Sequence, residues 1–138
     1  MADMDYTSAT TLEGGMRCHT EFFDSKRAEF STDVDAEMGG LGELPSPGDM
    51  LAATVASCML SMIAYTGAQK GFDTEGACIQ SACGEGSQGV GSLHFDITVP
   101  VPTTPQQRRL IEAAVAHCPV GNSLHPDIPK EIIWHWTE

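Results

Sequence analysis

Basic residues are scarce in this sequence. Seven Lys and Arg residues face nineteen Asp and Glu residues, which gives a formal net charge of −12 and a pI near 4.6. A uniformly negative surface repels phosphate backbones and anionic lipid headgroups. We therefore expect neither nucleic acid nor a membrane as a partner. The first five residues contain acids and no basic segment, so we also expect no secretory signal peptide.

The cysteines lack the spacing of a disulfide framework or a structural zinc site. They are Cys18, Cys58, Cys78, Cys83 and Cys118. Their number is odd and no C-x-x-C occurs, which argues against a secreted scaffold and favours a cytoplasmic location. A zinc site could draw on Cys78, Cys83, Cys118, His94 and His117. It lacks paired short spacings, and an odd separation puts Cys78 and Cys83 on opposite strand faces. We expect no bound metal.

Charge is also missing from residues 50–69, a run long enough to cross a membrane. The run contains Ser, Thr, Gly and much Ala, so a core helix is the better interpretation. A small domain seldom has a helix without a solvent face. The helix therefore lies at the centre of the fold or is covered by a partner. Its regularly spaced side chains are Leu51, Val55, Cys58, Met62 and Tyr65. Their steps of four and three residues predict one shared face.

The pattern of the whole chain predicts a single α+β domain, residues 1–138, in the order βββ-α-ββ-α-β. The expected strands are 6–12, 16–23, 28–34, 74–83, 90–99 and 130–137, and the expected helices are 47–70 and 106–117. Turns are expected at 13–15, 24–27 and 84–89. Residues 39–42 are rich in glycine but lack the Lys-Ser/Thr of a phosphate loop, so they predict a flexible connection.

Two cysteines are candidates for thiol chemistry. Cys118 precedes Pro119 at a helix break, which predicts the N-cap of a short new helix. The positive end of a helix stabilises a thiolate, and His117 is a possible proton partner. A structural cysteine at a bend and a Cys-His hydrolase are the alternatives, although nothing marks an oxyanion hole. Cys58 in mid-helix fits a core residue as well as a reactive one.

Two segments together resemble the OsmC/Ohr superfamily. One is Ser46-Pro47 followed by LAATVASCM at residues 51–59, and the other is Cys118-Pro-Val with Ser-Leu at 123–124. The resemblance extends along nearly the whole chain. It implies an intertwined homodimer whose central helices are buried between subunits. It also implies a thiol peroxidase that reduces organic hydroperoxides, with Cys58 as the peroxidatic thiol and Cys118 as the resolving thiol. The resemblance also implies that no cofactor is bound and that the reductant is an external dithiol of the dihydrolipoamide type.

The resemblance further implies an arginine from the N-terminal strands that activates the thiol. In the family it is held by a glutamate just after the proline that opens the central helix. Arg17 is the first candidate for this arginine and Arg27 the second.

This sequence departs from the family pattern at the glutamate, because Gly48 follows the proline and Asp49 comes one residue later. We assign the acid role to Asp49, although one residue turns a helix by about 100°. The departure indicates a divergent OsmC-like member. The alternative function is a non-catalytic dimer that binds a small apolar ligand or senses redox state.

Overall fold

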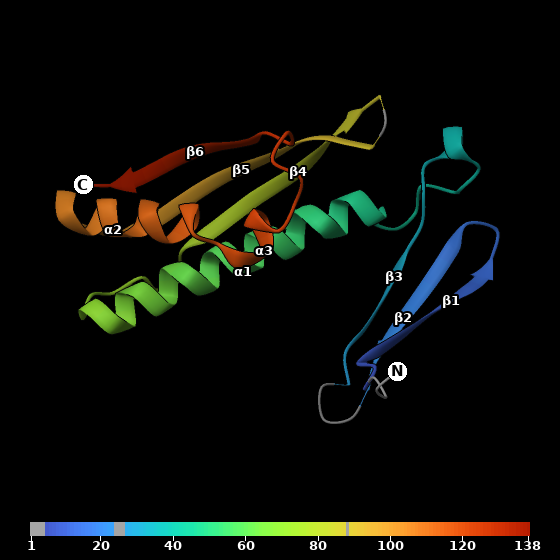
Figure 1. The fold of residues 1–138 in the computed structure, drawn as a ribbon, viewed down its shortest axis with the longest axis horizontal. Coiled ribbons are helices and arrows are strands. Elements are labelled where there is room, and N and C mark those ends of the chain that lie inside the picture. Colours follow the sequence, from blue (N-terminus) through green and yellow to red (C-terminus); the bar gives the residue numbers. More distant parts are fainter. Residues whose placement is uncertain (1–4, 24–26, 88) are drawn as a thin grey trace. The chain divides into compact units, whose positions relative to one another are not determined.

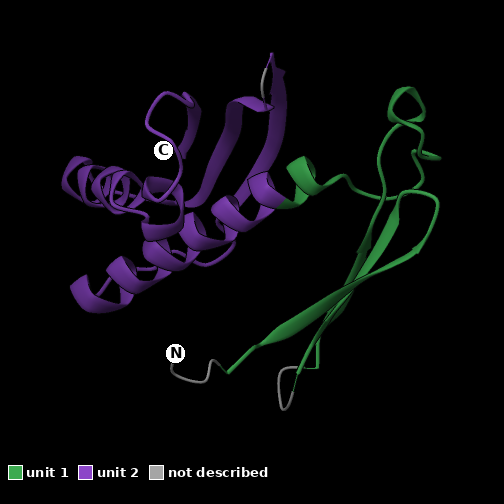
Figure 2. Cartoon of the chain, turned by 45° about the vertical axis from the view of Figure 1, so that its right-hand side comes forward, with its two compact units in different colours: residues 1–50 green, residues 51–138 purple. Residues whose placement is uncertain are grey.

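The chain folds into two compact units, residues 1–50 and residues 51–138 (Figure 2). They are seen in a computed structural model that describes residues 5–23, 27–87 and 89–138. The turn predicted at 24–27 lies mostly outside the described residues, and the loop predicted at 84–89 does so at Gln88.

The first unit is a three-stranded antiparallel meander in the order β1-β2-β3, as predicted. The strands are β1 Ser8–Gly14, β2 Arg17–Phe22 and β3 Glu29–Thr32, and the 3-10 helix η2 follows at Ala36–Met38. Gly14 and Gly15 form the β1–β2 turn with φ of 139° and 55°. Side chains other than glycine rarely adopt these angles, so the glycines allow the tight turn that starts β2 at Arg17.

The second unit contains the other sheet, in the order β4-β5-β6 (Figure 1). Its strands are β4 Cys78–Gly86, β5 Gly89–Pro102 and β6 Lys130–Thr137. β4 and β5 pair antiparallel, whereas β5 and β6 pair parallel. A parallel pair needs a long crossover. Helices α2 Pro105–Ala116 and α3 Pro119–Asn122 supply it. The predicted element order is confirmed, with α3 as the short helix expected after Cys118.

The predicted loop at 84–89 is shorter than expected. Pairing continues to Gly86 and Gly89 through a bulge between Gly84 and Glu85. A bulge absorbs one extra residue without ending the ladder. At this end β4 and β5 therefore extend further than the alternation of apolar residues indicates, whereas β4 begins at Cys78, four residues later than predicted.

Helix α1, Pro47–Lys70, begins in the first unit and is the core helix of the second. It is long and apolar enough to span a membrane by length and composition alone. Its buried side chains instead pack in the core of the second unit with those of β5. They are Ala52, Val55, Ala56, Met59 and Ile63. α1 and α2 lie on the same face of the sheet (Figure 1), toward which alternate β5 residues such as Leu93 and Phe95 point. The core-helix interpretation is confirmed.

The predicted apolar face of α1 is out of phase with the buried one. Val55 belongs to both, but Tyr65 is 54% exposed, and Cys58 and Met62 lie at the edge of the buried stripe. The hydrophobic periodicity of an alanine-rich helix is weak, so it does not indicate which face is buried. The side of α1 away from the core is exposed and uncharged.

Candidate active site

The two candidate thiols meet in the second unit. Cys58 is half-buried on α1 and packs against the apolar core. Cys118 is 1% exposed at the N-cap of α3. The two thiols lie close enough to influence each other's electrostatics, although they are far apart in the sequence. The fold thus places a partly accessible thiol beside a buried one.

Cys118 sits where a cap residue was predicted, but its thiol is not acidified. Burial raises the pKa of Cys118, and the contact with Cys58 raises it further. The backbone amides of Gly121 and Val120 act in the opposite direction, as expected at a helix start. Burial outweighs them, so Cys118 is a neutral thiol at neutral pH. The helix-start effect named from the sequence is thus present, but a single helical turn is smaller than the desolvation that opposes it.

Gly121 keeps the space beside Cys118 open. A Cβ atom at this position would lie 3.6 Å from Cys118 Sγ, 3.5 Å from Val55 Cγ1 and 3.3 Å from Lys130 Cε. The contact with Lys130 is tight and the other two are ordinary van der Waals contacts, so Gly121 lies packed between α1 and the Cys118 thiol. Neither Gly121 nor Lys130 was singled out in the sequence. The only signal was a glycine three residues after a candidate thiol.

The first unit contains a separate charged cluster centred on Arg17. Arg17 Nη2 donates to Glu43 Oε2 at 3.0 Å and lies 3.6 Å from Asp33 Oδ2. The hydrogen bond to Glu43 raises the pKa of Arg17 further above its already high value. Arg17 also lines a hollow of about 350 Å³. Its guanidinium is thus held in one place and remains reachable.

Asp33 is the anchor of this cluster and was missed by the sequence analysis. It is 2% exposed, and its carboxylate accepts from the amides of Val34 at 2.8 Å and Leu41 at 3.2 Å. The amide of Val34 is the largest cause that lowers the pKa of Asp33, so the group is ionised in the fold. The signal in the sequence was an acid inside a predicted strand.

The glycine-rich segment 39–42 builds the cradle around Asp33. A Cβ at Gly40 would lie 2.0 Å from the carbonyl oxygen of Val34 and 2.6 Å from Asp33 Oδ1. The backbone can approach the carboxylate only because this side chain is missing. Flexibility was the expected reason for these glycines. Close approach is the reason that the structure gives for Gly40.

Asp49 lies in a different role from the predicted one. Its carboxylate accepts from the amide of Ser46 at 3.0 Å, and the Ser46 hydroxyl lies 3.1 Å from the amide of Asp49. This is a reciprocal cap that satisfies free amides at the start of α1. The acids that hold Arg17 are Glu43 and Asp33 instead. The carboxylate partner of the arginine therefore comes from outside the helix.

The other candidate residues are spread over the fold. His117 Nδ1 lies 2.8 Å from the carbonyl oxygen of Ala113, so its ring is engaged along α2. Cys78 is exposed and Cys83 is half-buried against the core, on opposite faces as predicted. Among the described residues, the side chains grouped closely enough to share a metal ion are His19, Glu21 and Glu29. None of these belongs to the zinc set considered from the sequence.

Comparisons with known proteins place these features in a family. The family described as OsmC-like protein matches residues 40–132, which is more than half of the chain. A crystal structure from Psychrobacter arcticus 273-4, of a protein named for osmotic stress induction and a detoxification response, is 28% identical. It covers 97% of this chain and 98% of its own, with a TM-score of 0.91. A search of curated protein sequences gives no match.

Two organic hydroperoxide resistance proteins share the fold at lower identity. The one from Legionella pneumophila, also named OsmC, is 18% identical with a TM-score of 0.73, and covers 96% of this chain and 99% of its own. The one from Elizabethkingia anophelis, with thiocyanate bound, is 21% identical with a TM-score of 0.73, and covers 99% and 100%. On the family match and the shared fold, this chain belongs to the OsmC-like protein family.

Proposed function

We propose that this protein is a thiol peroxidase that reduces organic hydroperoxides to alcohols. The single observation that carries the proposal is the contact between Cys58 and Cys118. The pairing of a half-buried thiol with a buried one supports a division of roles, with Cys58 as the attacking sulfur and Cys118 as the resolving sulfur. The organic hydroperoxide resistance proteins among the structural neighbours support the same class of substrate.

The reaction has two steps on the protein. The Cys58 thiolate attacks the terminal peroxide oxygen, the O–O bond breaks, and the alkoxide takes a proton and leaves as the alcohol. Cys58 is then a sulfenic acid. The sulfur of Cys118 attacks the sulfur of Cys58, an S–S bond forms, and water leaves. An external dithiol of the dihydrolipoamide type reduces the disulfide. The raised pKa of Cys118 fits this order, because a neutral thiol does not compete for the peroxide.

We assign Arg17 to the activation of the Cys58 thiolate. The family resemblance gives this role to an N-terminal arginine, and Arg17 is held by two carboxylates. A guanidinium fixed by acids retains its orientation when it meets an anion. In this proposal Glu43 and Asp33 do the work of the family glutamate, whose position is occupied by Gly48 in this chain. Asp49 keeps its capping role.

We further propose a homodimer in which a second copy covers α1. The side of α1 away from the core exposes Ser57, Ser61, Ala64 and Tyr65 and has no charged residue until Lys70. An uncharged helix face on a chain of net charge −12 is suited to burial by another protein surface. We expect a dimer by light scattering after gel filtration. Ala64→Glu should shift it toward monomer, whereas Ala68→Glu, near the exposed end of the helix, should shift it less.

The test of the function is the consumption of an organic hydroperoxide with dihydrolipoamide as the reductant. We expect turnover by the wild type and loss of turnover in Cys58→Ser and in Cys118→Ser. Cys78→Ser is the matched control, because Cys78 is exposed on the other face of the sheet and should leave turnover unchanged. Arg17→Lys should lower kcat/KM and slow alkylation of Cys58 at neutral pH, since a lysine keeps the charge but loses the fixed fork.

The contrary result is a folded wild type that consumes no hydroperoxide with this dithiol or with dithiothreitol. That outcome would favour the alternative of a dimer that binds a small apolar ligand or senses redox state. Turnover that survives in Cys58→Ser would contradict the assignment of the attacking sulfur.

A further inference from the structure

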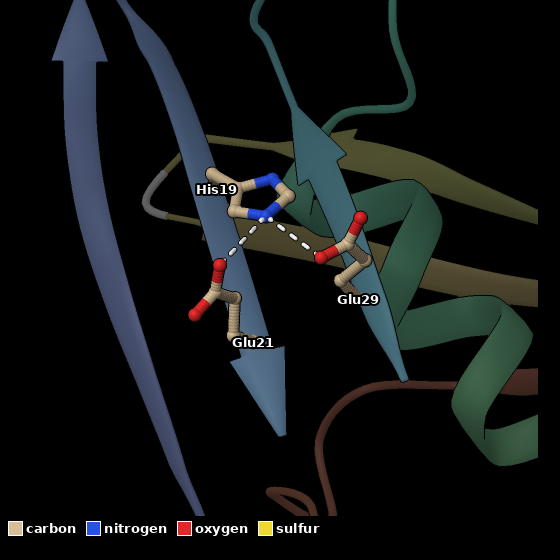
Figure 3. A group of neighbouring side chains, drawn as sticks. All are labelled: His19, Glu21 and Glu29. Carbon is tan, nitrogen blue, oxygen red and sulfur yellow. Dashed lines mark ion pairs between the residues drawn. The ribbon is translucent and has the colours of Figure 1, made fainter. Parts of the chain in front are cut away.

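We propose that His19, Glu21 and Glu29 form a site for one divalent transition-metal ion, with Zn²⁺ as its representative. The site belongs entirely to the first unit and does not involve the two thiols. His19 and Glu21 come from β2 and Glu29 from β3, and the three side chains converge over the same face of the ribbon (Figure 3). One ligand atom from each lies within 4.8 Å of the others.

The strand register creates this convergence. Glu21 pairs directly with Glu29 across the two strands, and His19 pairs with Ser31. Residues at alternate positions share a face, so all four side chains project together. Like charges directly opposite each other destabilise a strand pair. The Glu21–Glu29 pair therefore favours a positive charge between the two carboxylates.

The imidazole of His19 is oriented for ligation. Its Nδ1 lies 2.8 Å from Ser31 Oγ. In the tautomer in which Nδ1 donates to Ser31, Nε2 carries a lone pair and points toward both carboxylates. A histidine ligand of a metal is commonly held by such a hydrogen bond from its other nitrogen. Ser31 is thus the positioning residue of the proposed site.

The distances agree with a single small cation as the shared partner. His19 Nε2 lies 3.5 Å from Glu29 Oε2 and 3.7 Å from Glu21 Oε1. Ligand bonds of about 2.0–2.2 Å at tetrahedral angles separate two zinc ligands by roughly 3.4 Å. The two nitrogen–oxygen distances are within a few tenths of an ångström of that spacing, and the two carboxylate oxygens lie within 4.8 Å of each other. One imidazole and two carboxylates suit a borderline cation and leave a fourth position for water.

The charged groups around the site leave room for a cation. On β1, the residues opposite Glu21 and His19 are Ala9 and Thr11, which carry no charge. Arg17 lies two residues from His19, but Glu43 and Asp33 engage its guanidinium. Arg27 lines the same open hollow as Glu21 and Glu29 and is the one described cation there. It competes with a metal for the carboxylates, so its removal should strengthen metal binding.

The first unit also has a physical use for a metal. All its buried residues among those described are polar: Thr20, Thr32 and Asp33. Small units without an apolar core commonly rely on metals, disulfides or partners for stability. A metal that bridges β2 and β3 would fix their register.

The test is a titration of the metal-free, reduced full chain with Co²⁺, followed by displacement with Zn²⁺. We expect one equivalent of Co²⁺, with visible d–d absorption and without thiolate-to-cobalt charge transfer. His19→Gln should abolish binding, and Glu21→Gln and Glu29→Gln should each weaken it at least about tenfold. Ser31→Ala should weaken it about tenfold. Arg27→Gln should tighten it, and Glu37→Gln is the matched acidic control that should leave it unchanged.

Three results would overturn the proposal. They are no binding by the wild type, equal affinity in Glu21→Gln and the wild type, or an absorption spectrum dominated by thiolate charge transfer. The Cys58→Ser/Cys118→Ser double variant should bind Co²⁺ as the wild type does. Loss of binding there would move the metal to the thiols. Metal-free Glu21→Gln should melt no lower than the wild type, since it removes a like-charge pair, so a loss of binding cannot be attributed to unfolding.

Discussion

The two units of this chain are stabilised by different interactions. In residues 51–138 the buried side chains are almost all apolar, and they lie on α1, on alternate positions of β5 and on α2. In residues 1–50 the described buried side chains are polar, and an ionised Asp33 is held by backbone amides and Arg17. The candidate thiols lie in the apolar unit and the candidate activating arginine lies in the polar one. The comparison shows that the thiols are placed by packing, whereas the arginine is placed by charge.

The largest effect should come from a cavity in the apolar unit. Phe95 is 2% exposed on β5, the central strand of its sheet. Phe95→Ala should lower the free energy of unfolding by about 3–5 kcal/mol, through lost transfer energy and the cavity left behind. Urea denaturation followed by circular dichroism measures it. Ile133→Ala, at a site 59% exposed on the neighbouring strand, is the control and should cost less than about 1 kcal/mol. Equal effects would contradict the assignment of the core.

The polar unit should be most sensitive to added volume near Asp33. Gly40→Ala places a Cβ against the carbonyl of Val34 and against the Asp33 carboxylate. Relief of that overlap requires a backbone shift, so we expect a loss of about 1–3 kcal/mol by the same denaturation assay. Gly121→Ala, whose Cβ would meet its neighbours at 3.3–3.6 Å, should cost less. A neutral Gly40→Ala would show that the cradle is looser than described.

The thiol pair should make the apolar unit sensitive to alkali. Burial raises the pKa of Cys118, so the folded chain keeps a proton that the unfolded chain loses above about pH 8.5. The contribution to stability is full below that pH and is lost as the pH rises through the folded pKa. Unfolding free energies measured across this range under reducing conditions should fall. Cys118→Ser should flatten the decline, and an unchanged decline would exclude Cys118 as its source.

The charged cluster should make the polar unit sensitive to acid. The amides of Val34 and Leu41 lower the pKa of Asp33, so the unfolded chain binds a proton below about pH 3.9 that the folded chain resists. The contribution of Asp33 to the free energy of unfolding is full above that pH and is lost as the pH falls through the pKa of Asp33 in the folded chain. Asp33→Asn should flatten this acid limb, measured by thermal melts from pH 5 downward. Glu112→Gln, an exposed site on α2, should retain it.

Most of the element order could be predicted from the sequence, because strands and helix starts carry local signals. The proline-led helix starts were predicted to within one residue, and β6 was predicted at its observed residues. The phase of α1 could not be predicted. Its alanine-rich surface offers nearly equal apolar faces, and the sheet decides which one is buried. The split into two sheets likewise depends on pairing between distant segments.

The candidate site, too, could be predicted only where the sequence signal is local. The cap position of Cys118 follows from a local Cys-Pro signal, and the structure places it there. Its contact with Cys58 is long-range, and no spacing rule predicts it. The carboxylates that bind Arg17 could not be predicted from the sequence either. Asp33 is held by a loop in which Gly40 permits the close approach of the backbone. The residue after the helix-opening proline is Gly48, and the acid next to it, Asp49, caps the helix instead.

The central claim is that Cys58 and Cys118 act as one redox pair. The most direct measurement is mass spectrometry of the unreduced, thiol-blocked protein after one equivalent of an organic hydroperoxide. We expect a disulfide between Cys58 and Cys118 in the wild type, and a stable sulfenic acid on Cys58 in Cys118→Ser. A wild type that carries a sulfinic acid on Cys58, with Cys118 still reduced, would contradict it.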